Sequence, residues 1–140
     1  MRFLMLMIPG AAAMSTPPDP QFFAAMMRYN EALTRAGVLR DLSGLHPISD
    51  GARIVFQGGE RRVVDGNDIV APDVVGGYWI IETASKEAAI DWVKQCPCTN
   101  GETIELRRIH EMADFPDEII EATAESAAVV SSGLEGLRPA

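Results

Sequence analysis

The residue in this chain best suited to acid–base chemistry is His46, because the pKa of an imidazole ordinarily lies near neutral pH. His46 precedes Pro47 in a segment punctuated by glycine and proline, and the acids Asp41, Asp50 and Asp65 stand nearby in the sequence. Any of the three would orient the ring if folding brings it close. We take His46 and Asp65 as the candidate catalytic pair. The alternative, that His46 is an exposed or structural loop residue, stays open.

Positive charge that suits a carboxylate substrate is concentrated in one stretch, ARIVFQGGERRVV. Arg53, Arg61 and Arg62 lie there on two β-rich runs, and guanidinium groups bind carboxylates through paired hydrogen bonds. We take Arg53 and Arg61, with Tyr78 on the following apolar strand, as candidate substrate-binding residues. The same arginines would equally suit the solvated face of a strand.

The acid-rich stretch VVDGNDIVAPDVVGGYW is typical of a turn rather than of an ion site. A calcium loop starting at Asp65 would lack its third ligand, because Ile69 stands there. A phosphate loop would lead into a helix and carry a lysine, whereas a strand follows here. The pair Asp65–Gly66 predicts a turn, because an aspartate binds its own backbone there and a glycine allows a positive φ. The pair Gly76–Gly77 predicts a bulge or a close approach of two backbone segments.

The two cysteines, Cys96 and Cys98, lie two residues apart in QCPCTN, a spacing that rarely reaches the geometry of a disulfide. Zinc would need further cysteine or histidine ligands, and the sequence contains only two histidines, His46 and His110. We therefore expect no metal and no cofactor. We interpret the cysteines as partly buried thiols in a reducing cytoplasm, with a metal or redox role as the less favoured alternative.

The composition is that of one globular domain, with 140 residues of which 47% are hydrophobic and 23% are charged. The net charge of −8 argues against nucleic-acid and membrane partners. Nucleic acids and membrane surfaces are negatively charged, and proteins that bind them usually carry an excess of Lys and Arg. The opening MRFLMLMIPG imitates a signal peptide, but its apolar run is short and Pro9–Gly10 stops it. A buried strand is the better interpretation, and we expect a cytoplasmic protein.

Local patterns predict an alternation of strands and helices. The strands expected are residues 3–8, a hairpin of 53–57 and 60–64 around Gly58–Gly59, 78–83 and 103–109. One helix begins after the N-cap Asp19 and ends at Gly37; a second follows Ser85 and ends at Pro97. A third begins near Pro116, and the tail from 131 to 140 is expected to fray. The order indicates an α+β protein, a ferredoxin-like βαββαβ fold with an antiparallel sheet, an extra hairpin and a C-terminal helix.

The apolar pattern of the strands also predicts how the protein associates. The runs FLMLMI, IVF and YWII are apolar at consecutive positions, so both faces of the sheet would carry hydrophobic side chains. Two helices cover one face, and soluble monomers seldom expose a large apolar patch on the other. The C-terminal helix would cover a part of that face, and a second copy would cover all of it. We therefore predict a homodimer.

Several segments in the same order resemble the YCII-related superfamily, specifically its DGPF-domain branch. They are Asp65–Gly66, the strand start Gly76–Gly77–Tyr78, the helix SKEAAIDWVKQCP and the strand IELRRI. The resemblance implies a dimeric α+β barrel of ferredoxin-like subunits, with a YCII-related domain at 1–113 and a C-terminal helix and tail at 114–140. The signature is altered, because Asn67–Asp68 replaces its Pro-Phe half.

Two functions from different classes remain open. Some DGPF relatives are encoded beside extracytoplasmic-function sigma factors, which implies a non-catalytic binding or accessory module with an indirect link to sigma-factor regulation. Other YCII relatives carry a proposed His-Asp acid–base pair with the histidine on the first helix, and the first helix expected here has no histidine. The second hypothesis is a cofactor-independent lyase, isomerase or hydrolase that acts on a small acid through His46 and Asp65.

Overall fold

The computed structural model describes residues 1–10, 19–70, 74–99 and 101–137. The sequence predicts a Pro-rich connection at 14–20, of which residues 14–18 lie outside the described residues. The chain divides into two units, Met1–Ile109 and His110–Ala140, and each is described by itself.

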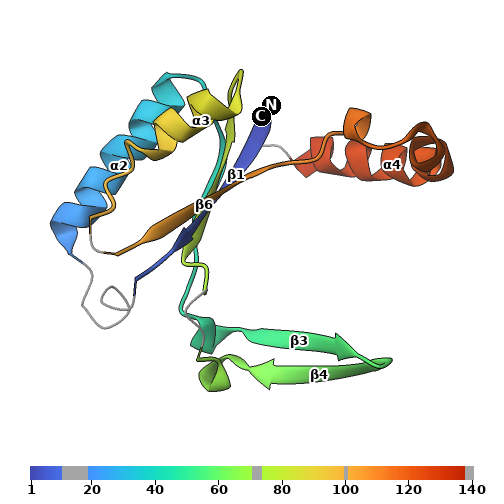
Figure 1. The fold of residues 1–140 in the computed structure, drawn as a ribbon, viewed down its shortest axis with the longest axis horizontal. Coiled ribbons are helices and arrows are strands. Elements are labelled where there is room, and N and C mark those ends of the chain that lie inside the picture. Colours follow the sequence, from blue (N-terminus) through green and yellow to red (C-terminus); the bar gives the residue numbers. More distant parts are fainter. Residues whose placement is uncertain (11–18, 71–73, 100, 138–140) are drawn as a thin grey trace. The chain divides into compact units, whose positions relative to one another are not determined.

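The first unit is built on a four-stranded antiparallel sheet. Its strands are β1 (Arg2–Ile8), β2 (Leu39–Gly44), β5 (Gly77–Glu82) and β6 (Thr103–Arg108), in the spatial order β2-β5-β1-β6. Helix α2 (Pro20–Arg35) connects β1 to β2, and helix α3 (Lys86–Val93) connects β5 to β6. Both helices lie on the same side of the sheet (Figure 1). The order and the layers confirm the predicted ferredoxin-like α+β fold.

Local capping signals determine where α2 begins and ends. Asp19 accepts a hydrogen bond from the Gln21 amide at 2.9 Å, and Pro20 occupies the first helical position, where its missing N–H costs nothing. Gly37 adopts φ 70° just past the last turn, which only glycine does readily. The sequence predicted both ends of this helix correctly.

Helix α3 begins as expected at Ser85, whose Oγ accepts from the Ala88 amide at 3.1 Å. It ends at Val93, earlier than the predicted stop at Pro97, and a turn carries the chain on to Cys96. The Lys94 amide still bonds the Ile90 carbonyl four residues back, but the amides of Gln95 and Cys96 bond carbonyls three residues back, as in a tightening last turn.

The core lies between the helices and the sheet. Phe3 and Met5 of β1 and Trp79 and Ile81 of β5 are buried against the apolar side of α2, where Leu33 has no exposed surface. The other buried core residues are Met26, Tyr29, Ala89 and Cys96. Met26, Tyr29 and Leu33 thus form one apolar stripe of α2, which packs on the sheet.

Polar atoms in the core have partners that tie its layers together. The Tyr29 hydroxyl donates to the Trp92 carbonyl at 2.9 Å, which links α2 to α3. The Trp79 indole N–H donates to Asn30 Oδ1 at 2.8 Å, which links the sheet to α2. Buried Tyr and Trp are stable only when their polar atoms are bonded in this way.

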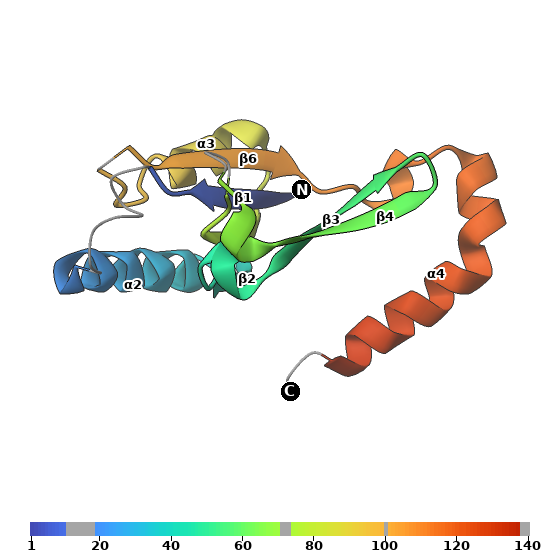
Figure 2. The ribbon, with the colours of Figure 1, turned by 90° about the horizontal axis from the view of Figure 1, so that it is seen from below.

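The extra hairpin is present as predicted, but the sequence did not predict β2 and wrongly counted the run IVF of the hairpin among the strands of the main sheet. Strands β3 (Ala52–Gln57) and β4 (Glu60–Asp65) form a separate two-stranded sheet, which Figure 2 shows as a twisted ribbon. The turn itself is as predicted, since Gly58 and Gly59 adopt φ 59° and 82°. The run IVF therefore contributes nothing to the main sheet, and Phe56 is 71% exposed.

The base of this hairpin contains the Asp65–Gly66 turn. Asp65 bonds its own backbone as predicted, accepting from the Asn67 amide at 2.9 Å at the start of the short 3-10 helix η2 (Gly66–Asp68). Gly66 does not use the positive φ that glycine allows. Glycine is needed there because a Cβ would lie 1.7 Å from the carbonyl oxygen of Ile48, at the start of the 3-10 helix η1 (Ile48–Asp50).

The close approach predicted at Gly76–Gly77 is confirmed. A Cβ on Gly76 would lie 2.7 Å from Pro9 Cγ, and one on Gly77 would lie 3.1 Å from the Ser43 carbonyl oxygen. The Gly76 amide also donates to the Met7 carbonyl at 2.8 Å. Two small residues thus let the chain enter β5 between β1 and β2.

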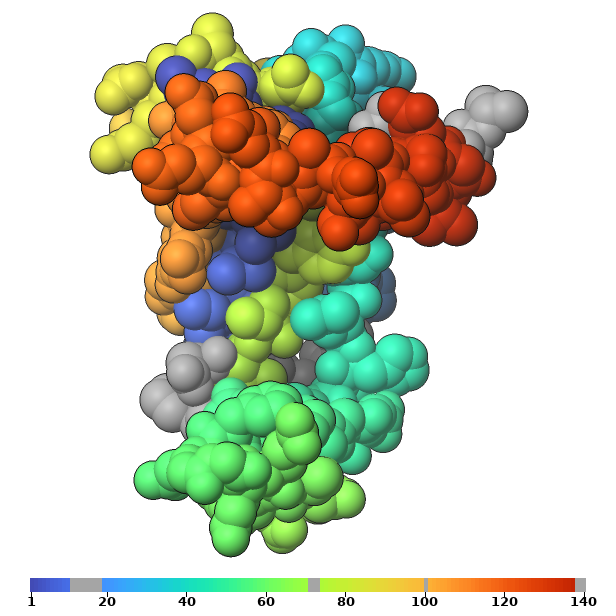
Figure 3. Space-filling view, turned by 90° about the vertical axis from the view of Figure 1, so that its right-hand side faces the viewer, coloured from blue at the N-terminus to red at the C-terminus, as the bar shows by residue number. Residues whose placement is uncertain are grey.

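The face of the sheet opposite the helices is apolar in the middle and polar at its sides. Because strand residues alternate, the partners of the buried Phe3, Met5, Trp79 and Ile81 point to this face. They are Leu4, Leu6 and Ile8 of β1 and Tyr78 and Ile80 of β5, all half-buried. We call these five residues the open face. In Figure 3 atoms of β1 (blue) and β5 (yellow-green) lie at the surface.

The second unit consists of the 3-10 helix η3 (Met112–Asp114) and helix α4 (Asp117–Leu137). Asp117 and Glu118 lie in the first turn of α4, where the helix dipole favours acids. The prediction that the tail frays from Ser131 is wrong as far as Leu137, because α4 continues to that residue. Among the described helices, none is both long enough and apolar enough to cross a lipid bilayer.

Candidate functional site

His46 contacts one of the three acids that the sequence offered as its partners. Its Nδ1 lies 3.1 Å from Asp50 Oδ2, four residues further along the chain at the end of η1. The His46 side chain is 88% exposed and that of Asp50 is 64% exposed. The contact orients the ring, but water surrounds both groups, and an exposed pair of this kind is weak.

Asp65, the predicted partner of His46, is engaged elsewhere. Its Oδ1 accepts from both the backbone amide and the side-chain amide of Asn67, at 2.9 and 2.8 Å. The backbone hydrogen bond from Asn67 lowers the pKa of Asp65, because it stabilises the ionised carboxylate. A carboxylate that is held in this way builds the turn and is a poor proton acceptor.

The candidate arginines lie on different faces of the hairpin. The register pairs Arg53 with Val64 and Arg61 with Phe56, which puts Arg53 and Arg62 on one face and Arg61 on the other. The Arg61 guanidinium lies 5.8 Å from the centre of the Phe56 ring, within the range of a cation–π contact. The pattern is that of a solvated ribbon rather than of one carboxylate site.

Tyr78 belongs to a different surface again. It lies on the open face, and its hydroxyl donates to Asp41 Oδ2 at 3.1 Å across the β2–β5 pair. Asp41 is the third acid that the sequence offered to His46. The structure therefore brings His46 together with Asp50, and Tyr78 together with Asp41.

Sequence reasoning missed a groove of about 520 Å³ beside β2, β5 and α3. Its polar wall is the ion pair of Arg40 and Glu82, in which Arg40 Nε donates to Glu82 Oε2 at 2.7 Å. Its apolar lining includes Val38, Ala84, Ala88 and Trp92. Arg40 lies on the strand that the sequence did not predict, and Glu82 lies on another strand. Their pairing was therefore visible only after folding.

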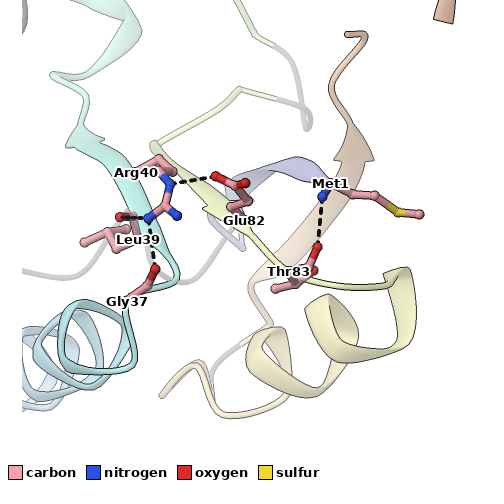
Figure 4. Close-up of polar contacts among 6 residues, drawn as sticks. All are labelled: Met1, Gly37, Leu39, Arg40, Glu82 and Thr83. Atoms are coloured by element: carbon pink, nitrogen blue, oxygen red, sulfur yellow. Dashed lines mark hydrogen bonds and ion pairs between the residues drawn. The ribbon is translucent and has the colours of Figure 1, made fainter. Parts of the chain in front are cut away.

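The Arg40 guanidinium is held by several contacts (Figure 4). Besides Glu82, its Nη1 donates to the carbonyl oxygens of Gly37 and Leu39, at 2.9 and 3.2 Å. These bonds use Nε and Nη1 of a group with five N–H donors, and they leave the two N–H groups of Nη2 for a ligand. The hydrogen bond and the charge of Arg40 lower the pKa of Glu82. The groove is thus lined by an oriented cation and, elsewhere in its wall, by an indole ring.

No group of three or more potential metal ligands gathers among the residues that the structure describes. Cys96 and Cys98 are free thiols, the first buried and the second half-buried. Their sulfur atoms lie 3.5 Å apart, closer than the spacing in the sequence led us to expect.

The fold and these surfaces define a ferredoxin-like α+β domain with an open sheet face and a small amphipathic groove. The family model of the YCII-related domain matches residues 1–113, which is most of the chain. The protein therefore belongs to the YCII-related family. No curated protein is similar enough to the chain to count as a match.

Proposed function

We propose that this YCII-related protein is a non-catalytic binding or accessory module that acts as a homodimer. The observation that carries the proposal is the Arg40 groove. The Arg40 guanidinium and Trp92 both line it, and no described residue accepts a hydrogen bond from Nη2. The residues suited to acid–base work, His46 and Asp50, are instead open to water, whereas catalysis by such groups depends on a site that excludes it.

The chemistry of the groove favours a small carboxylate with an apolar body. The Arg40 N–H groups would bind the carboxylate, and the apolar part would lie against Trp92 and Ala88. Glu82 fixes the orientation of the guanidinium, although it also neutralises part of the charge that would attract a carboxylate. The accessory role in sigma-factor regulation remains a prediction of the resemblance to the DGPF branch.

Calorimetric titration with phenylacetate and with neutral phenylacetamide tests the ligand class. We expect the carboxylate to bind and the amide to bind at least about tenfold more weakly, because a charge-assisted hydrogen bond is the stronger one. Arg40→Gln should remove the difference. Arg35→Gln, on an arginine that is 79% exposed at the end of α2, is the matched control and should leave binding unchanged. If the Arg40→Gln variant bound phenylacetate as tightly as the unmodified protein does, the proposal would be contradicted.

The homodimer is proposed from the open face. Its centre is apolar and its sides are polar, with Asp41 and Ser43 on β2 and Glu105 and Arg107 on β6. A protein–protein interface commonly has this arrangement of an apolar core and a polar rim. A second copy of the same face would cover it symmetrically, and two-fold pairs are the commonest oligomers.

Sedimentation at micromolar concentration tests the dimer directly. We expect a dimer of the unmodified chain and dissociation of the Leu6→Glu variant, because the new carboxylate would be buried at the centre of the interface. Met27→Glu, at a 65% exposed position on α2, is the control and should leave the dimer intact. A stable monomer of the unmodified chain would end the proposal, whatever the variants do.

The contact of His46 with Asp50 favours a second candidate, a cofactor-independent lyase, isomerase or hydrolase that acts on a small acid. In that case Asp50, rather than Asp65, orients the ring. A screen of small cyclic acids for turnover, repeated with His46→Ala, separates the two functions. Turnover that the substitution abolishes without loss of folding favours the enzyme, and no turnover in the unmodified protein favours the binding module.

A further inference from the structure

The turn that follows α3 brings two thiols together. The Cys96 amide donates to the Val93 carbonyl at 3.0 Å, and the Cys98 amide donates to the Cys96 carbonyl at 2.8 Å. A bond between residues two apart closes a γ-turn, here with Pro97 in the middle. The turn directs both side chains to the same side, and their Sγ atoms lie 3.5 Å apart.

The two thiols have unequal surroundings. Cys96 belongs to the hydrophobic core and is 9% exposed, whereas Cys98 is half-buried and can be reached from outside. The hydrogen bond between the thiols lowers the pKa of Cys98, and the same hydrogen bond, together with burial, raises the pKa of Cys96. The accessible sulfur is therefore the better nucleophile, and the buried one lies directly behind it.

We propose that Cys96 and Cys98 form a thiol–disulfide exchange site that reacts with low-molecular-weight disulfides. Cys98 attacks one sulfur of the small disulfide, whose S–S bond breaks and releases one thiol, leaving a mixed disulfide on Cys98. The Cys96 sulfur then loses its proton and attacks the Cys98 sulfur, and the second small thiol leaves. The two cysteines are oxidised by two electrons, and the small disulfide is reduced to two thiols.

The geometry favours the second step. The sulfurs have to approach from 3.5 Å to about 2.05 Å, the length of an S–S bond, and both already lie on the same side of a closed turn. Groups held together in this way react with an effective concentration far above that of a free thiol. A mixed disulfide on Cys98 is therefore expected to resolve within the chain rather than persist or join two chains.

Intact-mass measurement of the full chain in glutathione buffers tests the site. With oxidised glutathione in excess, we expect the chain to lose two hydrogen atoms and both free thiols, to retain no glutathione and to recover with dithiothreitol. The Cys96→Ser variant should keep one glutathione on Cys98. The Cys98→Ser variant should react at least about tenfold more slowly, because its remaining thiol is buried and protonated.

Three results on the unmodified protein would overturn the proposal, even if a variant fails to fold. The first is that both thiols survive excess oxidised glutathione. The second is a stable mixed disulfide that does not resolve. The third is a disulfide between two chains in place of one within a chain. None of these measurements depends on whether the Arg40 groove binds a ligand.

Discussion

The Gly66→Ala substitution offers the sharpest test of how the hairpin is attached. In the native backbone the new Cβ would lie 1.7 Å from the Ile48 carbonyl oxygen and 2.6 Å from that of Gly51. An ordinary carbon–oxygen contact is about 3.3 Å, so η1 and η2 would have to separate by about 1.6 Å (3.3 − 1.7). The contacting atoms belong to the backbone, and no rotation of a side chain relieves the clash.

The separation removes the hydrogen bond from the Gly66 amide to the Gly51 carbonyl, which is 2.9 Å long. A lost hydrogen bond with backbone strain costs on the order of 2 to 4 kcal/mol, which is enough to open a two-stranded sheet that is marginally stable by itself. The four-stranded sheet should be unaffected, because its strands pair only with one another.

Hydrogen exchange followed by mass spectrometry, on peptides covering residues 48–66 and on β1 and β5, measures both effects. We expect Gly66→Ala to remove protection from the hairpin while β1 and β5 keep theirs. Gly51→Ala is the matched control, because its Cβ would lie 3.5 Å from the same Ile48 oxygen and its φ of −130° suits alanine. Equal protection in the two variants would refute the steric explanation of Gly66.

Three further predictions concern stability. Leu33→Ala should lower the free energy of unfolding in urea by about 2 to 5 kcal/mol, because Leu33 is fully buried; a loss under 1 kcal/mol would contradict its place in the core. Ser85→Ala should lower the free energy of unfolding by about 1 kcal/mol, because it removes the side-chain cap of α3, and Ser85→Asp should lower it much less. Equal losses in the two variants would show that the cap does not stabilise the helix. The pKa of Glu82 is lowered by the hydrogen bond and charge of Arg40, so its stabilising effect is present above about pH 4.5 and is lost as the pH falls further. The urea midpoint of the Arg40→Gln variant should therefore fall less between neutral and acid pH than that of the unmodified protein. If the two proteins show the same pH profile, the Arg40–Glu82 ion pair does not cause this fall.

The sequence predicted well those features whose causes are local. The caps at Asp19 and Ser85 act within three residues, and the turn at Gly58–Gly59 needs only two glycines with positive φ. Strand β2 was missed because LRDLSG is a polar edge strand that lacks both the apolar run and the alternation of a typical strand. It is a strand because it pairs with β5, which is a tertiary cause.

The candidate site was predicted less well for the same reason. The contact of His46 with Asp50 spans four residues and was one of the alternatives, whereas the preferred partner, Asp65, bonds to its neighbour Asn67. The groove needs Arg40 from an unpredicted strand and Glu82 from another strand, and no short motif joins them. Proximity across a sheet has no signature in a single sequence.

The Asp65–Gly66 turn shows how a segment that resembles a family signature can serve the fold alone. Asp65 holds η2 through Asn67, and Gly66 lets the Ile48 carbonyl approach, so both residues have a structural task that needs no ligand. Their presence therefore bears on architecture and not on chemistry. The groups that we propose to bind a ligand or to react lie elsewhere, at Arg40 and at the pair Cys96 and Cys98. A search for the activity of this protein should begin at those two places.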